Sequence, residues 1–314
     1  MTVQDKKVKT TQEKDDRDKR QKKRQILTNF SAICFVWLFE FTAYSGLQNL
    51  QAAINADTGL YSLTAITVGG VISCLVAPTL ISYVGSKGAL VLSCVCVCIY
   101  VTANYYPEPY ILITAGGIIG LSTGMMWTAQ SCYVTDMCME YHKLTGEAFD
   151  AILSKLFGVF FVAFQSSQVW GNLISSVVFQ TDTSTTDQTN TTDCGADFCP
   201  RDQTTGDGNE TINVIRSPEH KLEIILISIY LGCSLIGLLI VIFLLKPIKS
   251  AMEDKYATFQ QRLSSNGRIL CTDLNMALLV PFGLFVGIEQ TVMFAQFTNV
   301  SNSQKQGYIT TSIQ

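Results

Sequence analysis

The chain has 314 residues, of which 48% are hydrophobic and only 15% are charged, whereas an ordinary soluble domain carries about 25% charged residues. The charges are crowded into a few segments and are nearly absent elsewhere. This composition excludes a disordered chain, a basic nucleic-acid-binding protein and a small disulfide scaffold. It also argues against the two soluble domains that the length alone would suggest.

The chain begins with a strongly charged segment. Residues 1–25 contain ten Lys and Arg residues against five Asp and Glu residues. Such a run is typical of a disordered, solvated tail, and it is too polar to begin a cleavable signal peptide. We therefore expect residues 1–25 to form a basic tail in the cytoplasm.

Seven apolar stretches follow this tail. Each approaches or exceeds the roughly 17–25 residues with which a helix crosses a bilayer. They lie near residues 26–47, 60–84, 89–105, 110–134, 153–179, 222–245 and 274–298. A soluble protein could bury one such helix, but seven of them leave no side to face water. The sequence therefore predicts an all-α membrane protein surrounded by lipid.

The basic residues predict how these helices are oriented, because cytoplasmic loops carry the excess of Lys and Arg. With a cytoplasmic N-terminus, 18 of the 22 basic residues lie on the cytoplasmic side. We expect a multi-pass protein of the plasma membrane, with residues 246–273 as a cytoplasmic linker and residues 180–220 as an extracellular loop.

The predicted extracellular loop has its own signals. It is polar, and Asn190 and Asn209 each begin an acceptor sequence for N-glycosylation. Cys194 and Cys199 are separated by four residues and lie on the oxidising side of the membrane. They either form a local disulfide or remain free thiols.

Polar side chains inside hydrocarbon are costly, so they tend to face the interior of a bundle or a cavity. At about 100° per residue, polar side chains share one face in three of the apolar stretches. These cavity candidates are Glu40, Tyr44, Gln48, Trp127, Gln130, Gln165, Gln168 and Asn172. They either line a cavity for a solute or ion, or form hydrogen bonds that hold the helices together.

Glu40 is the most informative of these residues because it lies in the middle of the first apolar stretch. Burial in a medium of low dielectric favours the neutral form of a carboxyl group. Glu40 could therefore carry a proton, or it could be a neutral acid that hydrogen-bonds within the bundle. Cys94, Cys96 and Cys98 are predicted to be small buried side chains rather than metal ligands, because Cys96 falls on the opposite helical face.

The chain contains no phosphate-binding loop, zinc motif or nucleophile elbow. We therefore expect neither an enzyme nor a cofactor, metal or nucleic-acid partner. A short similarity between residues 46–49 and 287–290, on either side of the basic linker, is typical of transporters built from two six-helix halves. On this interpretation residues 26–245 are a six-helix N-terminal bundle, residues 274–314 contain the first helix of a truncated second half, and the chain is a fragment.

Three segments carry a resemblance to a known family: FTAYSGLQNLQ at 41–51, GLSTGMMWTAQ at 120–130 and FQSSQVWGNLISS at 164–176. On these segments the chain resembles the uncoordinated-93 family of the major facilitator superfamily, in particular its A-type branch. The resemblance implies a major-facilitator-like fold with twelve helices in the complete protein. Its founding member resembles a regulatory subunit of a two-pore potassium channel.

Two functions follow as expectations. The first is a non-enzymatic modulator of a potassium channel, with channel subunits as partners. The alternative is a major-facilitator solute transporter, proton-coupled through Glu40, whose small-molecule substrate the sequence does not identify. Residues 85–88 read GSKG, where typical transporters of the superfamily carry an Asp-Arg pair and more basic residues, and this departure disfavours ordinary transport.

Overall fold

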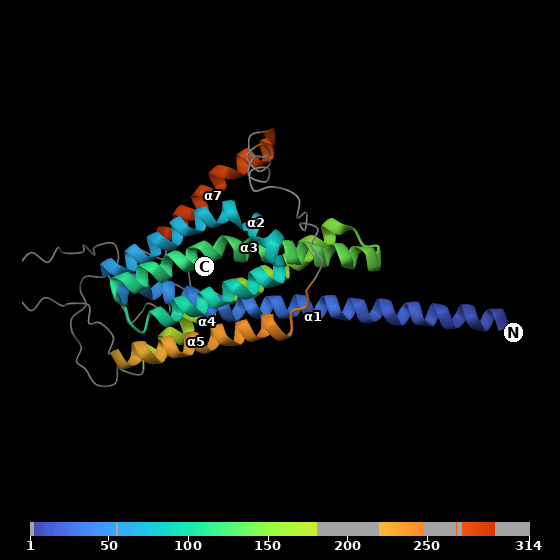
Figure 1. Ribbon diagram of the computed structural model, residues 1–314, viewed down its shortest axis with the longest axis horizontal. Coiled ribbons are helices and arrows are strands. Elements are labelled where there is room, and N and C mark those ends of the chain that lie inside the picture. The colour runs from blue at the N-terminus through green and yellow to red at the C-terminus, as the bar shows by residue number, and fades with distance from the viewer. Residues whose placement is uncertain (1–2, 55, 181–219, 248–267, 269–271, 293–314) are drawn as a thin grey trace, which may run out of the picture.

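The computed structural model describes residues 3–54, 56–180, 220–247, 268 and 272–292 (Figure 1). These residues form helices and no strand. The helices are α1 (Val3–Ile54), α2 (Ala56–Ala103), α3 (Pro109–Thr145), α4 (Phe149–Gln180), α5 (His220–Phe243) and α7 (Leu274–Val292). Within the described part, five helices (α1 to α5) are long and apolar enough to cross a membrane. Asn190, Asn209, Cys194 and Cys199 lie outside the described residues.

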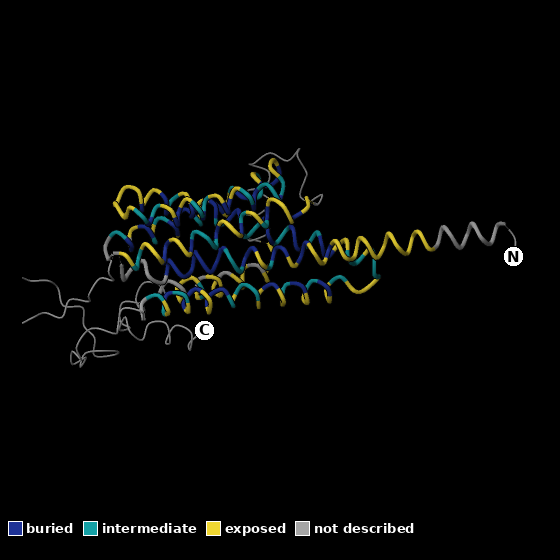
Figure 2. Tube along the Cα trace, turned by 90° about the horizontal axis from the view of Figure 1, so that it is seen from below, coloured by how far each residue is buried: buried dark blue, intermediate teal, exposed yellow. Residues whose placement is uncertain are grey.

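Helix α1 begins well before the first apolar stretch, at Val3. The prediction of a disordered tail is therefore wrong for the part of the tail that the structure describes. The segment lacks Gly and Pro and is rich in Lys, Arg and Gln, which favour helix, and it extends a helix that the apolar stretch has already nucleated. An ion pair between Lys19 and Asp15 at 2.7 Å supports the exposed turns. Figure 2 shows this exposed extension projecting beyond the bundle.

Helix α2 folds back on itself at Gly85, whose φ of 78° and ψ of 159° are not helical. Ser73, before this glycine, donates a hydrogen bond to the Leu121 carbonyl, and Ser93, after it, donates one to the Ser122 carbonyl. In a straight helix these two serines would lie about 30 Å apart. Because they contact neighbouring residues of α3, the first arm of α2 (before Gly85) and its second arm (after Gly85) lie side by side and antiparallel.

The first arm of α2 packs closely on α3 through a row of glycines. A β-carbon added to Gly120 would lie 2.9 Å from the Ile66 α-carbon, and one added to Gly124 would lie 2.8 Å from the Cys74 amide nitrogen. Small residues at every fourth position let two backbones approach each other in this way. This glycine row therefore sets the spacing of α2 and α3.

Helix α1 is the most enclosed of the five long helices. In its most apolar stretch 61% of the residues are buried, whereas the corresponding value for α4 is 11%. Aromatic side chains join α1 to α3 and α4, with ring centroids between 4.8 and 6.0 Å apart. The rings belong to Trp37, Phe41, Trp127, Phe160 and Phe164. Helix α1 thus forms the core of the bundle, and α4 leaves most of its surface uncovered among the described residues.

Candidate functional site

Glu40 lies at the centre of the bundle and is fully buried, with 0% of its surface exposed. Neither carboxyl oxygen has a hydrogen-bond partner among the described residues. Helix α5 approaches so closely at Gly237 that an added β-carbon there would lie 2.7 Å from Glu40 Oε1. The polar stripe on the first apolar stretch places Glu40 toward the bundle interior, and the structure buries it there with no hydrogen-bond partner for either oxygen among the described residues.

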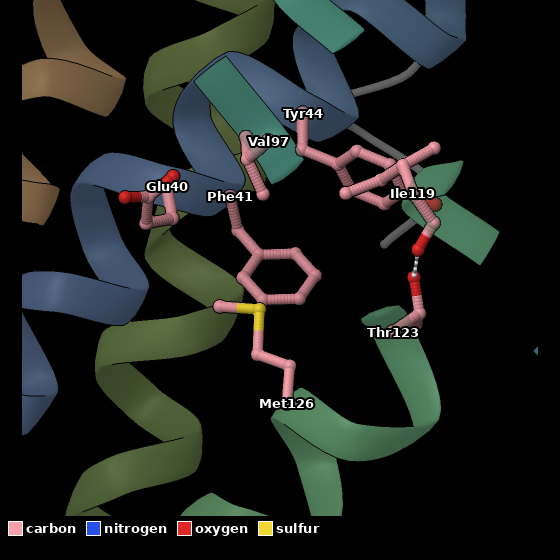
Figure 3. Close-up of a pocket in the computed structure, with 7 residues that line it drawn as sticks. All are labelled: Glu40, Phe41, Tyr44, Val97, Ile119, Thr123 and Met126. Atoms are coloured by element: carbon pink, nitrogen blue, oxygen red, sulfur yellow. Dashed lines mark hydrogen bonds between the residues drawn. The ribbon is translucent and has the colours of Figure 1, made fainter. Parts of the chain in front are cut away.

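A small cavity of about 10 Å³ lies beside Glu40 (Figure 3), with room for about one water molecule. It is enclosed by side chains of α1, the second arm of α2 and α3. The lining residues are Glu40, Phe41, Tyr44, Val97, Ile119, Thr123 and Met126. Figure 3 shows the Glu40 carboxyl pointing away from the other labelled side chains, and Gly237 places α5 on the side toward which it points. The cavity and the carboxyl are therefore neighbours rather than one polar pocket.

Tyr44 and Gln48 lie on the same buried face of α1. Gln48 Nε2 donates a hydrogen bond of 3.0 Å to the Tyr44 hydroxyl oxygen. The Tyr44 ring also contacts Tyr100 of the second arm of α2, with centroids 6.0 Å apart. These two predicted cavity residues thus pair with each other along one helix.

The two predicted residues of α3 separate into different environments. Trp127 is half-buried and its ring packs against Phe164, with centroids 5.0 Å apart, so it belongs to the aromatic core. Gln130 is buried and accepts a hydrogen bond of 3.2 Å from the Ser131 hydroxyl. Its Nε2 has no partner among the residues that the structure describes.

The polar face of α4 is only partly covered. Gln168 and Asn172 are buried, whereas Gln165 is exposed. Next to Asn172, an added β-carbon on Gly171 would lie 3.0 Å from the Thr42 carbonyl oxygen, so this glycine lets α1 approach. The structure therefore brings Gln168 and Asn172, but not Gln165, into the bundle.

One buried contact was not apparent from the sequence. The Tyr230 hydroxyl of α5 donates a hydrogen bond of 2.9 Å to the Gly171 carbonyl and shares one of 2.7 Å with the Ser175 hydroxyl. Tyr230 lies against Gly46, where an added β-carbon would be 2.6 Å from the tyrosine ring. Tyr230 lies in the most apolar of these helices, where no polar stripe singles it out. The signal that could have found it was a pair of glycines, Gly46 and Gly171, in two of the quoted motifs.

The described part of the chain contains no group of three or more His, Cys, Asp or Glu side chains that could hold a metal ion. Cys94 is buried, and Cys96 and Cys98 are half-buried. Among the described residues the site therefore consists of one isolated carboxyl, a few buried amides and the aromatic core.

The amino-acid sequence was compared with those of known proteins and protein families. The family described as "Ion channel regulatory protein UNC-93" matches residues 50–313, which include the second and third of the quoted motifs. Protein unc-93 homolog A of Bos taurus is 34% identical over 282 residues, which cover 87% of this chain and 60% of that protein. Its counterpart of Homo sapiens is 32% identical over 283 residues, again with 87% of this chain and 60% of that protein covered.

The unc-93 protein of Caenorhabditis elegans is named "Putative potassium channel regulatory protein unc-93". It is 30% identical over 286 residues, which cover 88% of this chain and 40% of that protein. The chain thus spans about 60% of the length of the homolog A relatives that it matches. The match extends over most of the chain, as the three motifs predict, and the chain belongs to the UNC-93 family.

Proposed function

We propose that the complete protein is a non-enzymatic regulatory subunit of a potassium channel in the plasma membrane. The observation that carries this proposal is membership of a family described by ion channel regulation, together with a relative named for potassium channel regulation. Regulation of a channel requires a surface that contacts the channel, and it requires neither a catalytic centre nor a solute cavity.

The interior of the described bundle supports an interaction role. The cavity beside Glu40 has a volume of about 10 Å³, whereas sites for small molecules occupy about 300–1,000 Å³. Tyr44 and Gln48 pair with each other instead of presenting free polar groups. The space beside Glu40 is thus too small for a solute, which suits a subunit that acts through its outer surface.

The architecture that we propose is major-facilitator-like. We count the two arms of α2 as separate crossings, which makes six crossings over residues 26–245, and we assign α7 to the start of a second half. Relatives that extend well beyond the matched region support the presence of such a half in the complete protein. We place the N-terminus in the cytoplasm, glycans on Asn190 and Asn209, and a disulfide between Cys194 and Cys199.

Recording two-pore potassium currents with and without the complete protein tests the regulatory role. We expect current amplitude or gating to change for at least one channel when the protein reaches the cell surface. Gly117→Ala, where an added β-carbon meets nothing within 4 Å, should preserve the effect, and Gly120→Ala, which clashes with α2, should weaken it. Unchanged currents across the channel set, with surface expression verified, would contradict the proposal.

A solute transporter is the second candidate, favoured by the isolated carboxyl of Glu40 and the unpaired amide groups of Gln130 and Gln168. In this function Glu40 would carry a proton with the solute. The complete protein should then take up solute in a pH-dependent manner, and Glu40→Gln should abolish that uptake. Uptake that survives the substitution unchanged would exclude this role of Glu40.

A further inference from the structure

Among the residues that the structure describes, no basic side chain lies near Glu40 to compensate a negative charge. The ionisable side chains near its carboxyl are thiols and a phenol: Cys94 and Cys98 of the second arm of α2, Cys233 of α5, and Tyr44 one turn away on α1. From α3, the cavity beside it is lined by Ile119, Thr123 and Met126, which do not ionise. From α4, the aromatic rings packed on α1 at this depth are likewise uncharged.

A carboxylate in this position would be desolvated, unpaired and surrounded by thiols and apolar groups. An isolated ion buried in this way is strongly unfavourable, whereas a neutral carboxylic acid costs far less. The packed structure, with α5 directly against the carboxyl at Gly237, is therefore compatible with the protonated form of Glu40.

The hydrogen bonds that join α5 to other helices lie on either side of Gly237 rather than beside Glu40. Two turns before Gly237, Tyr230 hydrogen-bonds to Gly171 and Ser175 of α4. After Gly237, Lys87 Nζ donates a hydrogen bond of 2.9 Å to the Ile242 carbonyl. Between these contacts, the buried Ser234 hydroxyl has no partner among the described residues. Separation of the part of α5 around Gly237 from α1 therefore leaves these hydrogen bonds intact.

We propose that Glu40 is a proton-binding site that controls the packing of α5 against α1. With its proton bound, the carboxyl is neutral and the junction at Gly237 is closed, as in the structure. Loss of the proton leaves a carboxylate that must be hydrated, and water enters as the middle of α5 moves away. This inference goes beyond the proposed function, because it holds whether the complete protein regulates a channel or transports a solute.

The sign and steepness of the effect follow from linkage. The closed junction binds one proton more than the open one, so raising the pH favours opening. An equilibrium that releases one proton shifts by about tenfold per pH unit over the range in which the proton is lost. At pH values below that range the junction stays closed.

Cys233 provides a reporter that the chain already contains. The whole chain is reconstituted in lipid vesicles and reacted with N-ethylmaleimide, a membrane-permeant thiol reagent, between about pH 6 and pH 9, and modification is measured by peptide mass spectrometry. Because every thiol reacts faster as the pH rises, the measured quantity is the rate at Cys233 divided by the rate at Cys34, a half-buried thiol of α1.

In the wild-type chain we expect this ratio to rise with pH, by up to about tenfold per unit. In Glu40→Gln the ratio should stay constant and low, and Glu40→Asp should retain the rise because it keeps an ionisable carboxyl. Glu40→Met is a second uncharged variant, used if Glu40→Gln does not give monodisperse protein. A flat ratio in the wild-type chain, or an equal rise in either uncharged variant, would overturn the proposal.

Discussion

The contact between Gly237 and Glu40 depends on the absence of a side chain at position 237. A β-carbon there would lie 2.7 Å from Glu40 Oε1 and 2.9 Å from its γ-carbon. We expect Gly237→Ala to destabilise the protein by about 1–3 kcal/mol, the range for overpacking a filled interior. Thermal unfolding of the detergent-solubilised protein measures this loss.

Gly232 provides the matched control on the same helix, because a β-carbon added there meets nothing within 4 Å. Gly232→Ala should be neutral or stabilise the helix by up to about 1 kcal/mol. If the two alanine variants unfold at the same temperature, α5 does not press against Glu40 as the structure places it.

The hydroxyl of Tyr230 joins α5 to α4, and its loss should be measurable. Tyr230→Phe leaves the Gly171 carbonyl and the Ser175 hydroxyl with one partner fewer. We expect a loss of about 0.5–1.5 kcal/mol, as is typical of hydrogen bonds between membrane helices. Tyr105→Phe removes a comparable bond of 2.8 Å to Ser228 in an exposed position and should cost less. Equal losses in thermal unfolding would show that burial does not strengthen the Tyr230 contact.

At the level of single residues, the sequence predicted which helical face is polar but not what covers it. Glu40 and Gln48 are buried as the stripe on α1 predicts, whereas Gln165 is exposed on α4. The angular positions of Gln165 and Asn172 around α4 place them on one face of the helix. Whether each side chain is buried, however, depends on the neighbouring helices that pack against it. Beside Asn172, Gly171 lets α1 approach closely. Tertiary packing of this kind cannot be derived from periodicity alone.

At the level of helices, the contact between the first arm of α2 and α3 should be sensitive to one methyl group. An added β-carbon on Gly120 would lie 2.9 Å from the Ile66 α-carbon, and backbone cannot yield as a flexible side chain can. We expect Gly120→Ala to destabilise the protein by about 1–3 kcal/mol and to lower its folded yield. Thermal unfolding and size-exclusion chromatography measure both quantities.

Gly117, on the same helix, separates this clash from the effect of alanine itself. Its added β-carbon meets nothing within 4 Å, so Gly117→Ala should retain wild-type yield and stability. A normal yield for Gly120→Ala would mean that α2 and α3 are farther apart than the structure places them.

The sequence located the apolar stretches well but not the ends of the helices. The stretch predicted near residues 110–134 lies within α3, which continues to Thr145. It ends where Gly146 adopts a left-handed conformation with φ of 73° and its N–H bonds to the His142 carbonyl. Hydropathy reports which part of a helix suits the bilayer, whereas a capping residue decides where the helix stops. Helix α1 likewise continues through its polar extension, because residues 3–25 contain no Gly or Pro that would end it.

For the whole molecule, the fold-back of α2 has a consequence that can be tested from outside the membrane. If each arm of α2 crosses the membrane, the chain crosses it five times before residue 181, and we expect the N-terminus and the predicted glycosylation sites to lie on opposite sides. If α2 crossed only once, they would lie on the same side. Whether α2 crosses once or folds back and crosses twice therefore decides on which side of the membrane each later segment of the chain lies.

We therefore expect Asn190 and Asn209 to be glycosylated while a tag at the N-terminus stays inaccessible to antibody in intact cells. Removal of glycans with a glycosidase should increase electrophoretic mobility, and Asn190→Gln combined with Asn209→Gln should abolish that change. Permeabilising the plasma membrane should expose the tag, which controls for its detection. An N-terminal tag accessible in intact cells on a glycosylated chain would place both parts on the same side, contradicting the antiparallel arms of α2 that the contacts of Ser73 and Ser93 define.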